Sequence, residues 1–362
     1  FSGISMDVVE RMILMLEMDI IPVVPEQGSV GASGDLAPLS HLVLPLLGYG
    51  QVWDAGVPTD TLSVLKKHKI KPLKLQAKEG LALINGTQFI LSHAIAGLDK
   101  FGYLLDLADL SAAMSLEAYQ GSASPFKKEL HEIRPYKGTK KVAARMLKFL
   151  KGSENLKYHE DCGRVQDPYS MRCVPQVHGA SRNAYEHLRE MAEIELNSVT
   201  DNPIVISNEE AISGGNFHGQ PMAMPLDYAT LAAAELGNIS DRRSYLLLEG
   251  KYGLPKLLIE SSGLNSGFMI PQYTTAALVT ENKTLCFPAS ADSVPTSLGQ
   301  EDHVSMGSIS GRKFNQVLGN LENIFAVELM FATQGLEFRR PLKSSKIVEE
   351  NFKIIREKVT KL

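Results

Sequence analysis

The chain has 362 residues, of which 44% are hydrophobic, enough to bury one large core or two of average size. Its 37 Lys and Arg residues nearly balance 41 Asp and Glu residues, so no field of one sign favours nucleic acid or an anionic membrane as a partner. The three cysteines are too few for a secreted disulfide scaffold, and no apolar run approaches the ~20 residues needed to cross a bilayer. These features predict a globular protein of the cytoplasm.

Long stretches with helical periodicity dominate the sequence. From Phe89 to Tyr119, apolar or small residues recur at steps of three and four, which keeps one face of a helix about eight turns long apolar. Pro225 to Leu248 and Phe314 to Leu336 repeat this spacing, and Gly179 to Val199 indicates a further helix. Helices of this length predict a mainly α protein built as a long-helix bundle.

Strand signals are weak and local. The β-branched stretch from Pro203 to Ser207 and the alternating segment from Pro72 to Leu75 are the main ones. No internal repeat and no linker long enough to separate two domains is evident. We therefore expect a region of loops and short helices over residues 1–84 and one continuous helical bundle over residues 85–362.

The stretch GSVGASGDLAPLSH, residues 28–41, contains three glycines within seven residues. Its spacing fits neither GxGxxG nor GxxxxGK[ST], so a phosphate-binding loop is a poor match. Two other interpretations stay open on spacing alone. One is a plain tight turn. The other is backbone cyclisation, in which the amide nitrogen of Gly34 attacks the carbonyl carbon of Ala32 and water is lost, including the hydroxyl of Ser33; glycine tolerates the compressed turn that this needs.

The pattern GASGD resembles the signature of the aromatic amino acid ammonia-lyases, whose Ala, Ser and Gly cyclise to 4-methylidene-imidazol-5-one (MIO). Five further blocks agree with that family in order: EGLALINGTQ (79–88), RVQDPYSMRCVPQVHG (164–179), SGGNFHG (213–219), GLNSGFM (263–269) and QEDHVSMG (300–307). The resemblance spans nearly the whole chain and is strongest to the histidine branch. It implies a carbon–nitrogen lyase that eliminates ammonia from L-histidine to give trans-urocanate, in histidine degradation.

The resemblance also implies an architecture: a long-helix bundle of the aromatic amino acid lyase type with a fumarase/aspartase-like helical core, the MIO loop lying in region 1–84. It implies a homotetramer whose active sites are shared between subunits. No dissociable cofactor and no metal are expected. Family members carry a YGVNTGFG-like loop with a catalytic tyrosine, and a later histidine, upstream of the position matching Phe1, so we expect an N-terminal segment of the parent enzyme to precede this chain.

Carried over residue by residue, the resemblance places the electrophile at Ala32, Ser33 and Gly34. Asn85 matches the residue that hydrogen-bonds the MIO carbonyl, as in an oxyanion hole, although an Asn here also suits a cap of the following helix. Glu301 matches the residue that selects histidine, because its carboxylate accepts a hydrogen bond from imidazole N–H or takes part in proton transfer. Relatives specific for phenylalanine or tyrosine usually carry glutamine there. The alternative is an acidic residue at a helix start.

A second group of residues matches the substrate pocket. Arg172 corresponds to the residue that grips the substrate carboxylate, which its planar fork suits, although an interhelical salt bridge is the common use of such an Arg. Tyr169 lies three residues earlier, on the same face of a helical turn, and corresponds to an active-site tyrosine. Gln166 and Phe217 match further pocket residues, although an isolated Phe in a Gly-rich loop is more often a core anchor.

The remaining polar residues of these blocks have more ordinary interpretations. His178, His218 and His303 lack companions at metal-ligand spacing, so we expect hydrogen-bonded histidines rather than a metal site. His41 is interpreted in the same way. Asp35 is expected to hold the modified loop, although a polar turn residue is the simpler reading.

Two rival functions follow from the same residues. The first, within the same family, is a tyrosine or phenylalanine ammonia-lyase, or an aminomutase that returns the amine to the β-carbon. Glu301 argues against the aromatic rivals. The other, from a different class, is a catalytically inactive helical assembly protein, because a bundle without a working electrophile needs similar apolar stripes.

Overall fold

The computed structural model describes residues 1–158 and 163–362, which divide into two compact units. Unit 1 comprises Phe1–Ala96, Leu188–Asp227 and Pro288–Arg312, and unit 2 comprises Gly97–His187, Tyr228–Phe287 and Lys313–Leu362. The boundary expected at residue 84 stays a prediction. No helix of the described ranges is both long enough and apolar enough to cross a membrane.

Unit 1 combines short helices with a small antiparallel sheet of order β1-β2-β3. Its elements before residue 85 are α1 (Met6–Glu17), β1 (Ile21–Pro22), α2 (Leu36–Val43), η1 (Leu44–Leu47), β2 (Gln51–Asp54), β3 (Val57–Asp60), α3 (Thr61–Lys67) and α4 (Glu79–Ile84). A second pair, β4 (Ile204–Val205) and β5 (Ala211–Ile212), is also antiparallel. Apolar side chains from the helices and β2 form a compact core, which includes Val8, Met15, Val43, Val52 and Val64.

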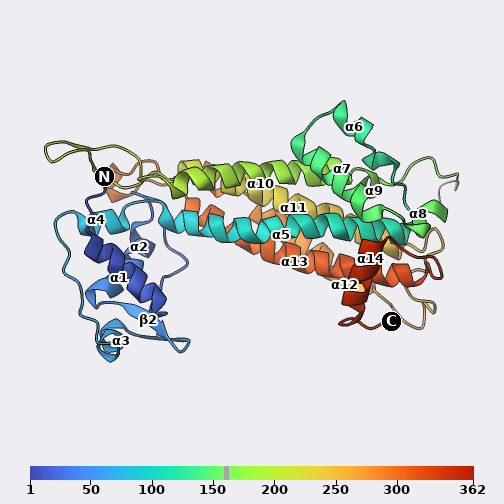
Figure 1. Cartoon of the computed structure of the whole chain (residues 1–362), viewed down its shortest axis with the longest axis horizontal. Helices are drawn as coiled ribbons and strands as arrows, with labels where there is room; N and C mark the ends of the chain where they lie inside the picture. The colour runs from blue at the N-terminus through green and yellow to red at the C-terminus, as the bar shows by residue number, and fades with distance from the viewer. Residues whose placement is uncertain (159–162) are drawn as a thin grey trace. The chain divides into compact units, whose positions relative to one another are not determined.

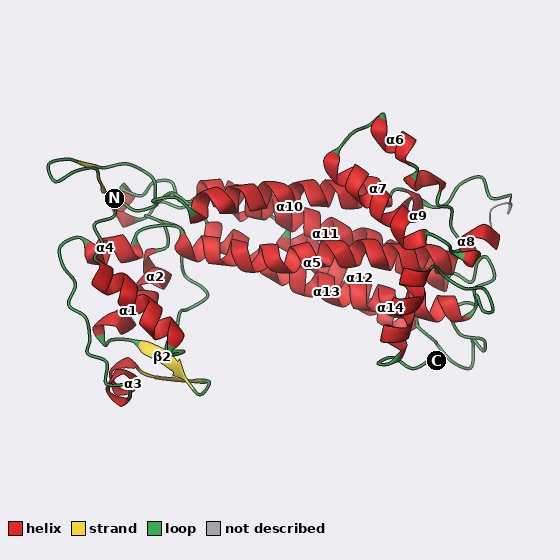
Figure 2. Ribbon diagram, in the orientation of Figure 1, coloured by secondary structure: helices red, strands yellow, loops and turns green. Residues whose placement is uncertain are grey.

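Unit 2 contains most of the length of four long helices, which Figures 1 and 2 show side by side there. They are α5 (Gln88–Tyr119), α10 (Val174–Leu196), α11 (Gln220–Leu248) and α13 (Gly307–Glu337). Around them lie α6 (Lys128–Glu132), α7 (Lys137–Leu150), α8 (Glu154–Tyr158), α9 (Tyr169–Arg172), α12 (Met269–Leu285) and α14 (Lys346–Arg356). Their shared core holds fully buried aromatic and aliphatic side chains, among them Tyr119, Phe126, Met146, Leu247 and Phe331.

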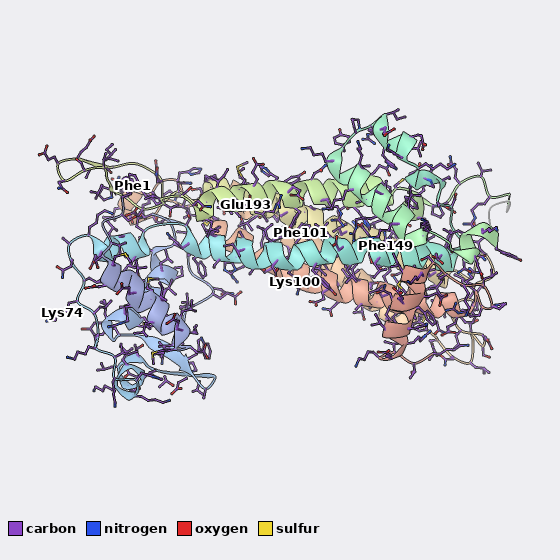
Figure 3. All side chains as sticks on the ribbon, viewed as in Figure 1. Phe1, Lys74, Lys100, Phe101, Phe149 and Glu193 are labelled. Carbon is purple, nitrogen blue, oxygen red and sulfur yellow. The ribbon has the colours of Figure 1, made fainter. Side chains whose placement is uncertain are left out.

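The apolar stripe of α5 explains how the bundle packs. Phe101 is fully buried and meets Tyr185 of α10 and Phe314 of α13 edge to face, with ring centroids 5.9 and 5.6 Å apart. The neighbouring Lys100, labelled beside Phe101 in Figure 3, is partly exposed, and its ammonium pairs with Glu322 at 2.6 Å. Neighbouring residues of α5 therefore face the core and the solvent, as expected for a helix with 3.6 residues per turn.

A layer of buried charge also crosses this core. Arg243 of α11 and Glu328 of α13 are both fully buried, and Arg243 Nε donates to Glu328 Oε1 at 2.5 Å. Three buried hydroxyls complete the carboxylate's hydrogen bonds: Ser111, Ser115 and Ser240. Burial opposes ionisation, but the Arg243 charge and these hydrogen bonds hold the pKa of Glu328 below its ordinary value.

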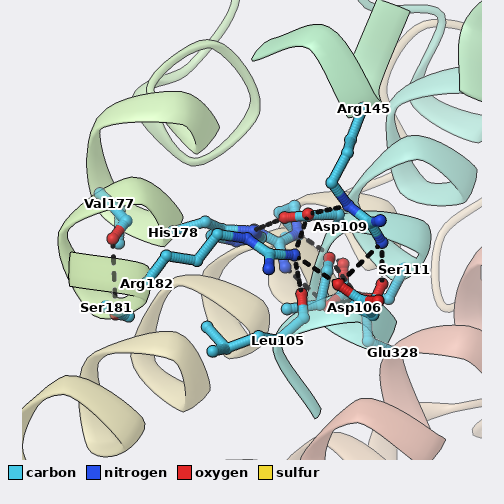
Figure 4. Close-up of polar contacts among 12 residues, drawn as sticks. Leu105, Asp106, Asp109, Ser111, Arg145, Val177, His178, Ser181, Arg182 and Glu328 are labelled. Carbon is cyan, nitrogen blue, oxygen red and sulfur yellow. Dashed lines mark hydrogen bonds and ion pairs between the residues drawn. The ribbon is translucent and has the colours of Figure 1, made fainter. Parts of the chain in front are cut away.

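His178 joins the same layer (Figure 4). Its Nδ1 lies 2.9 Å from Asp109 Oδ1, and Arg243 Nη1 donates to its Nε2 at 3.4 Å. Burial lowers the pKa of His178, so the ring is neutral and donates from Nδ1. Arg182 and Arg145 satisfy the other oxygen of Asp109 at 2.6 and 2.7 Å. His178 is therefore the hydrogen-bonded histidine that the sequence predicts.

The expected helices and strands agree with the structure in kind and differ at their ends. α5 matches its expected range, but α11 begins five residues before Pro225, which lies inside the helix. α13 begins seven residues before Phe314, because Gly and Ser residues in its first turns hide the helical period. The strand expected within Pro203 to Ser207 is β4. The strand expected at Pro72 to Leu75 is wrong: those residues form a loop, in which Leu73 N bonds Leu46 O and Pro72 has no N–H to donate.

We predict that Arg243→Met lowers the free energy of unfolding by about 3–5 kcal/mol, because it leaves Glu328 charged and unpaired in the core. The double variant Arg243→Met/Glu328→Leu removes both charges and should recover part of this loss. Urea unfolding of the parent, both single variants and the double variant measures the coupling. A double variant whose loss equals the sum of the single losses would contradict a coupled pair.

Candidate active site

The loop between β1 and α2 has a strained backbone. Ser33 has a positive φ of 51°, uncommon for a residue with a side chain, and Gly34 has a φ of 76°. Gly34 forms an isolated β-bridge with Gly86, so close that a Cβ added at Gly34 would lie 2.0 Å from the Gly86 carbonyl oxygen. Only glycine fits at this position.

Asn85 lies at the C-terminal end of α4, directly before Gly86. It is 3% exposed, and its Nδ2 donates to the Ser33 carbonyl oxygen at 2.6 Å. Its Oδ1 is buried and has no hydrogen-bond partner within the described part of the chain. The amide is therefore directed at the loop, where one donor is engaged and one acceptor remains for another group.

Glu301 approaches Ser33 from a segment 268 residues further along the chain. Its Oε1 accepts from Ser33 Oγ at 2.8 Å, and its Oε2 accepts from Ser297 and Thr296 hydroxyls at 2.6 and 2.8 Å. These hydrogen bonds, Ser297 first, hold the pKa of Glu301 below its ordinary value. An ionised carboxylate thus faces the Ser33 side chain at neutral pH.

Asp35 anchors the far end of the same loop. It is fully buried and accepts from Ser29 Oγ at 2.8 Å and from the backbone N–H of Ile90, in the first turn of α5, at 3.0 Å. Its own N–H donates to Gly86 O at 2.8 Å. Burial raises the pKa of Asp35 to about 6, although both hydrogen bonds to the carboxylate oppose the rise. Asp35 holds the loop, as the sequence predicts.

The segment leading into α13 supports the loop from a third direction. Met306 N donates to Val30 O at 3.0 Å, and Ser308 Oγ donates to Ser29 O at 2.8 Å. Sequence reasoning missed Ser308 and the contact of Met306, although both follow directly on the block QEDHVSMG or lie within it. Contacts between segments this far apart have no local signal.

Two histidines join the blocks that contain Phe217 and Glu301. His218 and His303 stack with ring centroids 5.5 Å apart, and His303 Nδ1 lies 3.4 Å from His218 Nε2. Phe217 is half-buried in the turn beside His218. Across the ranges 1–158 and 163–362, no group of three or more His, Cys, Asp or Glu side chains forms a metal-binding arrangement.

The other expected pocket residues lie in unit 2. Tyr169 and Arg172 bound the one-turn helix α9, and the guanidinium carbon of Arg172 lies 4.7 Å from the Tyr169 ring centroid, so the two share a face as expected. Arg172 Nε is buried without a hydrogen-bond partner in the described residues. Arg172 and Gln166 line an open cavity of about 1070 Å³, whereas Tyr169 is 71% exposed and is not among the residues that line it.

The raised pKa of Asp35 predicts that the stability of the protein depends on pH. The pKa of Asp35 is about 6 in the folded protein and 3.8 in the unfolded chain. Its contribution to the free energy of unfolding is therefore fully present below pH 3.8 and is lost as the pH rises through 6, a change of about 3 kcal/mol. The free energy of unfolding of Asp35→Asn, relative to the parent, should rise by most of that amount between about pH 4 and pH 7.5. Urea unfolding across this range checks it. A difference that stays constant with pH would show that the Asp35 pKa is not raised.

The sequence model of the family described as aromatic amino acid lyase matches residues 1–357. A curated histidine ammonia-lyase of Natranaerobius thermophilus is 45% identical over 364 residues, covering 100% of this chain and 72% of the relative. The crystal structure of histidine ammonia-lyase from Trypanosoma cruzi matches with a TM-score of 0.92 and 42% identity, covering 99% of this chain and 68% of that one. A tyrosine aminomutase from Streptomyces globisporus matches with a TM-score of 0.93 and 37% identity, covering 100% and 72%.

These matches confirm the expected mainly α fold of the aromatic amino acid lyase type and the expected carbon–nitrogen lyase class. They also confirm the resemblance to the histidine branch, whose members recur among the relatives at 44–49% identity. The family is known to use MIO, and its histidine-specific members act on an amino acid. The chain belongs to the aromatic amino acid lyase family.

Proposed function

We propose that the protein eliminates ammonia from L-histidine without oxidation and releases trans-urocanate, using MIO formed from Ala32, Ser33 and Gly34. The observation that best supports this proposal is that one hydrogen-bond donor and one ionised acceptor both contact Ser33. Asn85 donates to its carbonyl oxygen, and the Glu301 carboxylate accepts from its hydroxyl. Once formed, MIO supplies an electrophilic carbon that turns the substrate amine, otherwise a poor leaving group, into one that departs.

The loop fits the formation of this group. Ring closure joins the Gly34 nitrogen to the Ala32 carbonyl carbon, and the Ala32 oxygen leaves as water with the amide hydrogens of Ser33 and Gly34. A second water takes the Ser33 hydroxyl and its Cα hydrogen. The support is the positive φ of Ser33 and Gly34 together with the tight contact at Gly86, which makes position 34 a glycine, the residue whose backbone best tolerates closure. The Ser33 carbonyl oxygen survives both losses, and it is the atom that Asn85 holds.

Asn85 would stabilise negative charge on that oxygen. Its Nδ2–H is fixed in place before any charge develops, so the hydrogen bond strengthens in the transition state at little cost in reorganisation. The unpartnered Oδ1 is free to accept a hydrogen bond from the substrate amine. This role replaces that of a helix cap, because the side chain is directed at Ser33.

Glu301 would recognise the imidazole ring. Its ionised carboxylate lies beside Ser33 Cβ, the carbon that becomes the exocyclic methylidene, so a substrate bound there meets an acceptor for imidazole N–H. A neutral phenyl ring offers no such donor. The same carboxylate is placed to take part in proton transfer during elimination.

Arg172 would bind the substrate carboxylate, and Tyr169, Gln166 and Phe217 are proposed as further substrate contacts. The support is the unpartnered Nε of Arg172 and the cavity that it lines with Gln166, since a buried guanidinium N–H without a partner favours an anion. No dissociable cofactor and no metal is part of this proposal. We place the enzyme in the cytoplasm, where a chain with three cysteines needs no disulfide framework.

We further propose a homotetramer whose active sites are shared between subunits. The support is an exposed apolar stripe along α11, where side chains that would ordinarily be buried are about half exposed: Tyr228, Leu231 and Tyr245. Their spacing of three and fourteen residues keeps them on one face of the helix. Such a face needs a partner surface in water.

The product assay tests the function directly. L-Histidine incubated with the purified protein should give equal amounts of ammonia and trans-urocanate, and Ser33→Ala should abolish both because it cannot form the methylidene. Ultraviolet absorbance and ammonia determination measure the two products. Recovery of a β-amino acid would indicate an aminomutase, and no turnover of histidine, tyrosine or phenylalanine would favour the inactive helical assembly.

Substrate choice is tested at Glu301. Glu301→Gln keeps the side-chain volume and removes the charge, so kcat/KM for L-histidine should fall by about 10- to 100-fold, the equivalent of a lost charged hydrogen bond of roughly 1.5–3 kcal/mol. Turnover of L-phenylalanine and L-tyrosine should not fall. Glu26→Gln, on an exposed side chain that pairs with Arg312, is a matched control. Equal losses on all three substrates would overturn the selectivity role.

A further inference from the structure

Arg164 and Asp167 form a buried ion pair beside the proposed substrate-binding residues. Arg164 Nη1 donates to Asp167 Oδ1 at 2.7 Å, and the two side chains are only 11% and 3% exposed. The second carboxylate oxygen of Asp167 accepts from Ser122 N at 2.6 Å, in the segment that follows α5. One carboxylate therefore joins Arg164 to the end of a long helix.

The guanidinium of Arg164 is fixed from its other side by aromatic rings. Its central carbon lies 3.7 Å from the Tyr252 ring centroid and 5.2 Å from that of Tyr119, and these rings are themselves packed edge to face, with centroids 5.1 Å apart. A planar cation against two ring systems has little freedom to rotate. Arg164 is thus anchored to α5 and to the segment after α11.

The pair flanks Gln166 and directly precedes α9, which carries Tyr169 and Arg172. Gln166 lies between Arg164 and Asp167 and is exposed, while both flanking charges are tied down. Asp167 is followed at once by Pro168, whose carbonyl oxygen accepts from Arg172 N at 3.1 Å and so begins α9. Fixing Asp167 fixes the first turn of α9 and with it the direction of Arg172.

We propose that Arg164 and Asp167 are positioning residues that hold Gln166 and Arg172 in the orientation that binds the substrate carboxylate. The inference rests on the proposed function for the identity of the substrate. Because carboxylate binding is equal in the ground state and the transition state, loosening the pair raises KM more than it lowers kcat. A merely structural ion pair would instead lower the amount of folded enzyme and leave both constants unchanged.

Asp167→Asn tests the proposal, because it keeps the shape of the side chain and weakens its hold on Arg164. In the purified protein, KM for L-histidine should rise about tenfold, the equivalent of about 1.4 kcal/mol, with kcat changed less than about threefold. Calorimetric binding of imidazolepropionate, which has a carboxylate, should weaken by the same factor. Binding of histamine, which lacks one, should stay the same. Asp54→Asn, in an exposed pair with Lys67, is the matched control and should change nothing.

Equal weakening of imidazolepropionate and histamine, or unchanged binding of both, would overturn the proposal. If Asp167→Asn fails to fold, Arg164→Lys provides a second test. It keeps the charge without the planar fork, and it should shift KM in the same direction. Calorimetry separates the proposed function from the positioning role of Arg164 and Asp167. A parent protein that binds imidazolepropionate but produces no urocanate would contradict the proposed function while leaving the positioning role measurable, and a parent that binds neither ligand would contradict both.

Discussion

The backbone contact between Gly34 and Gly86 constrains everything else around the loop. With no Cβ on Gly34, the turn after Ser33 closes against the segment that follows α4, and Asp35 N donates to the same Gly86 carbonyl. This approach brings the amide of Asn85, the preceding residue, within 2.6 Å of the Ser33 carbonyl oxygen. A strained turn, a preorganised donor and a buried carboxylate at Asp35 are therefore consequences of one close approach.

Buried polar side chains have two different roles in this chain. The Arg243–Glu328 pair in unit 2 has no buried side-chain atom without a hydrogen-bond partner, so its role is to fix how the helices pack. Among the residues proposed to contact the substrate, Asn85 Oδ1 in unit 1 and Arg172 Nε in unit 2 are buried without partners in the described residues. Such unfinished hydrogen bonding costs stability unless a ligand completes it, and it is where substrate contacts are proposed.

The sequence predicted most of the bundle and little of what surrounds the loop. Periodicity alone located α5, because its apolar stripe is long and free of proline, whereas the hairpin of β2 and β3 escaped notice although Ala55 and Gly56 turn with positive φ. The electrophile and its neighbours came from resemblance to a family, since spacing left a plain turn equally open. The contact between Ser33 and Glu301 joins residues 268 apart, and no local pattern encodes such a distance.

The most direct test of this account is an accurate mass of the purified protein and of the peptide containing residues 29–35, compared with the same chain carrying Ser33→Ala. Cyclisation with dehydration predicts a deficit of two waters, confined to that peptide and absent from the variant. An unmodified mass in both would mean that the loop at Ala32, Ser33 and Gly34 does not form the electrophile. The family fold would then stand without the chemistry proposed for it.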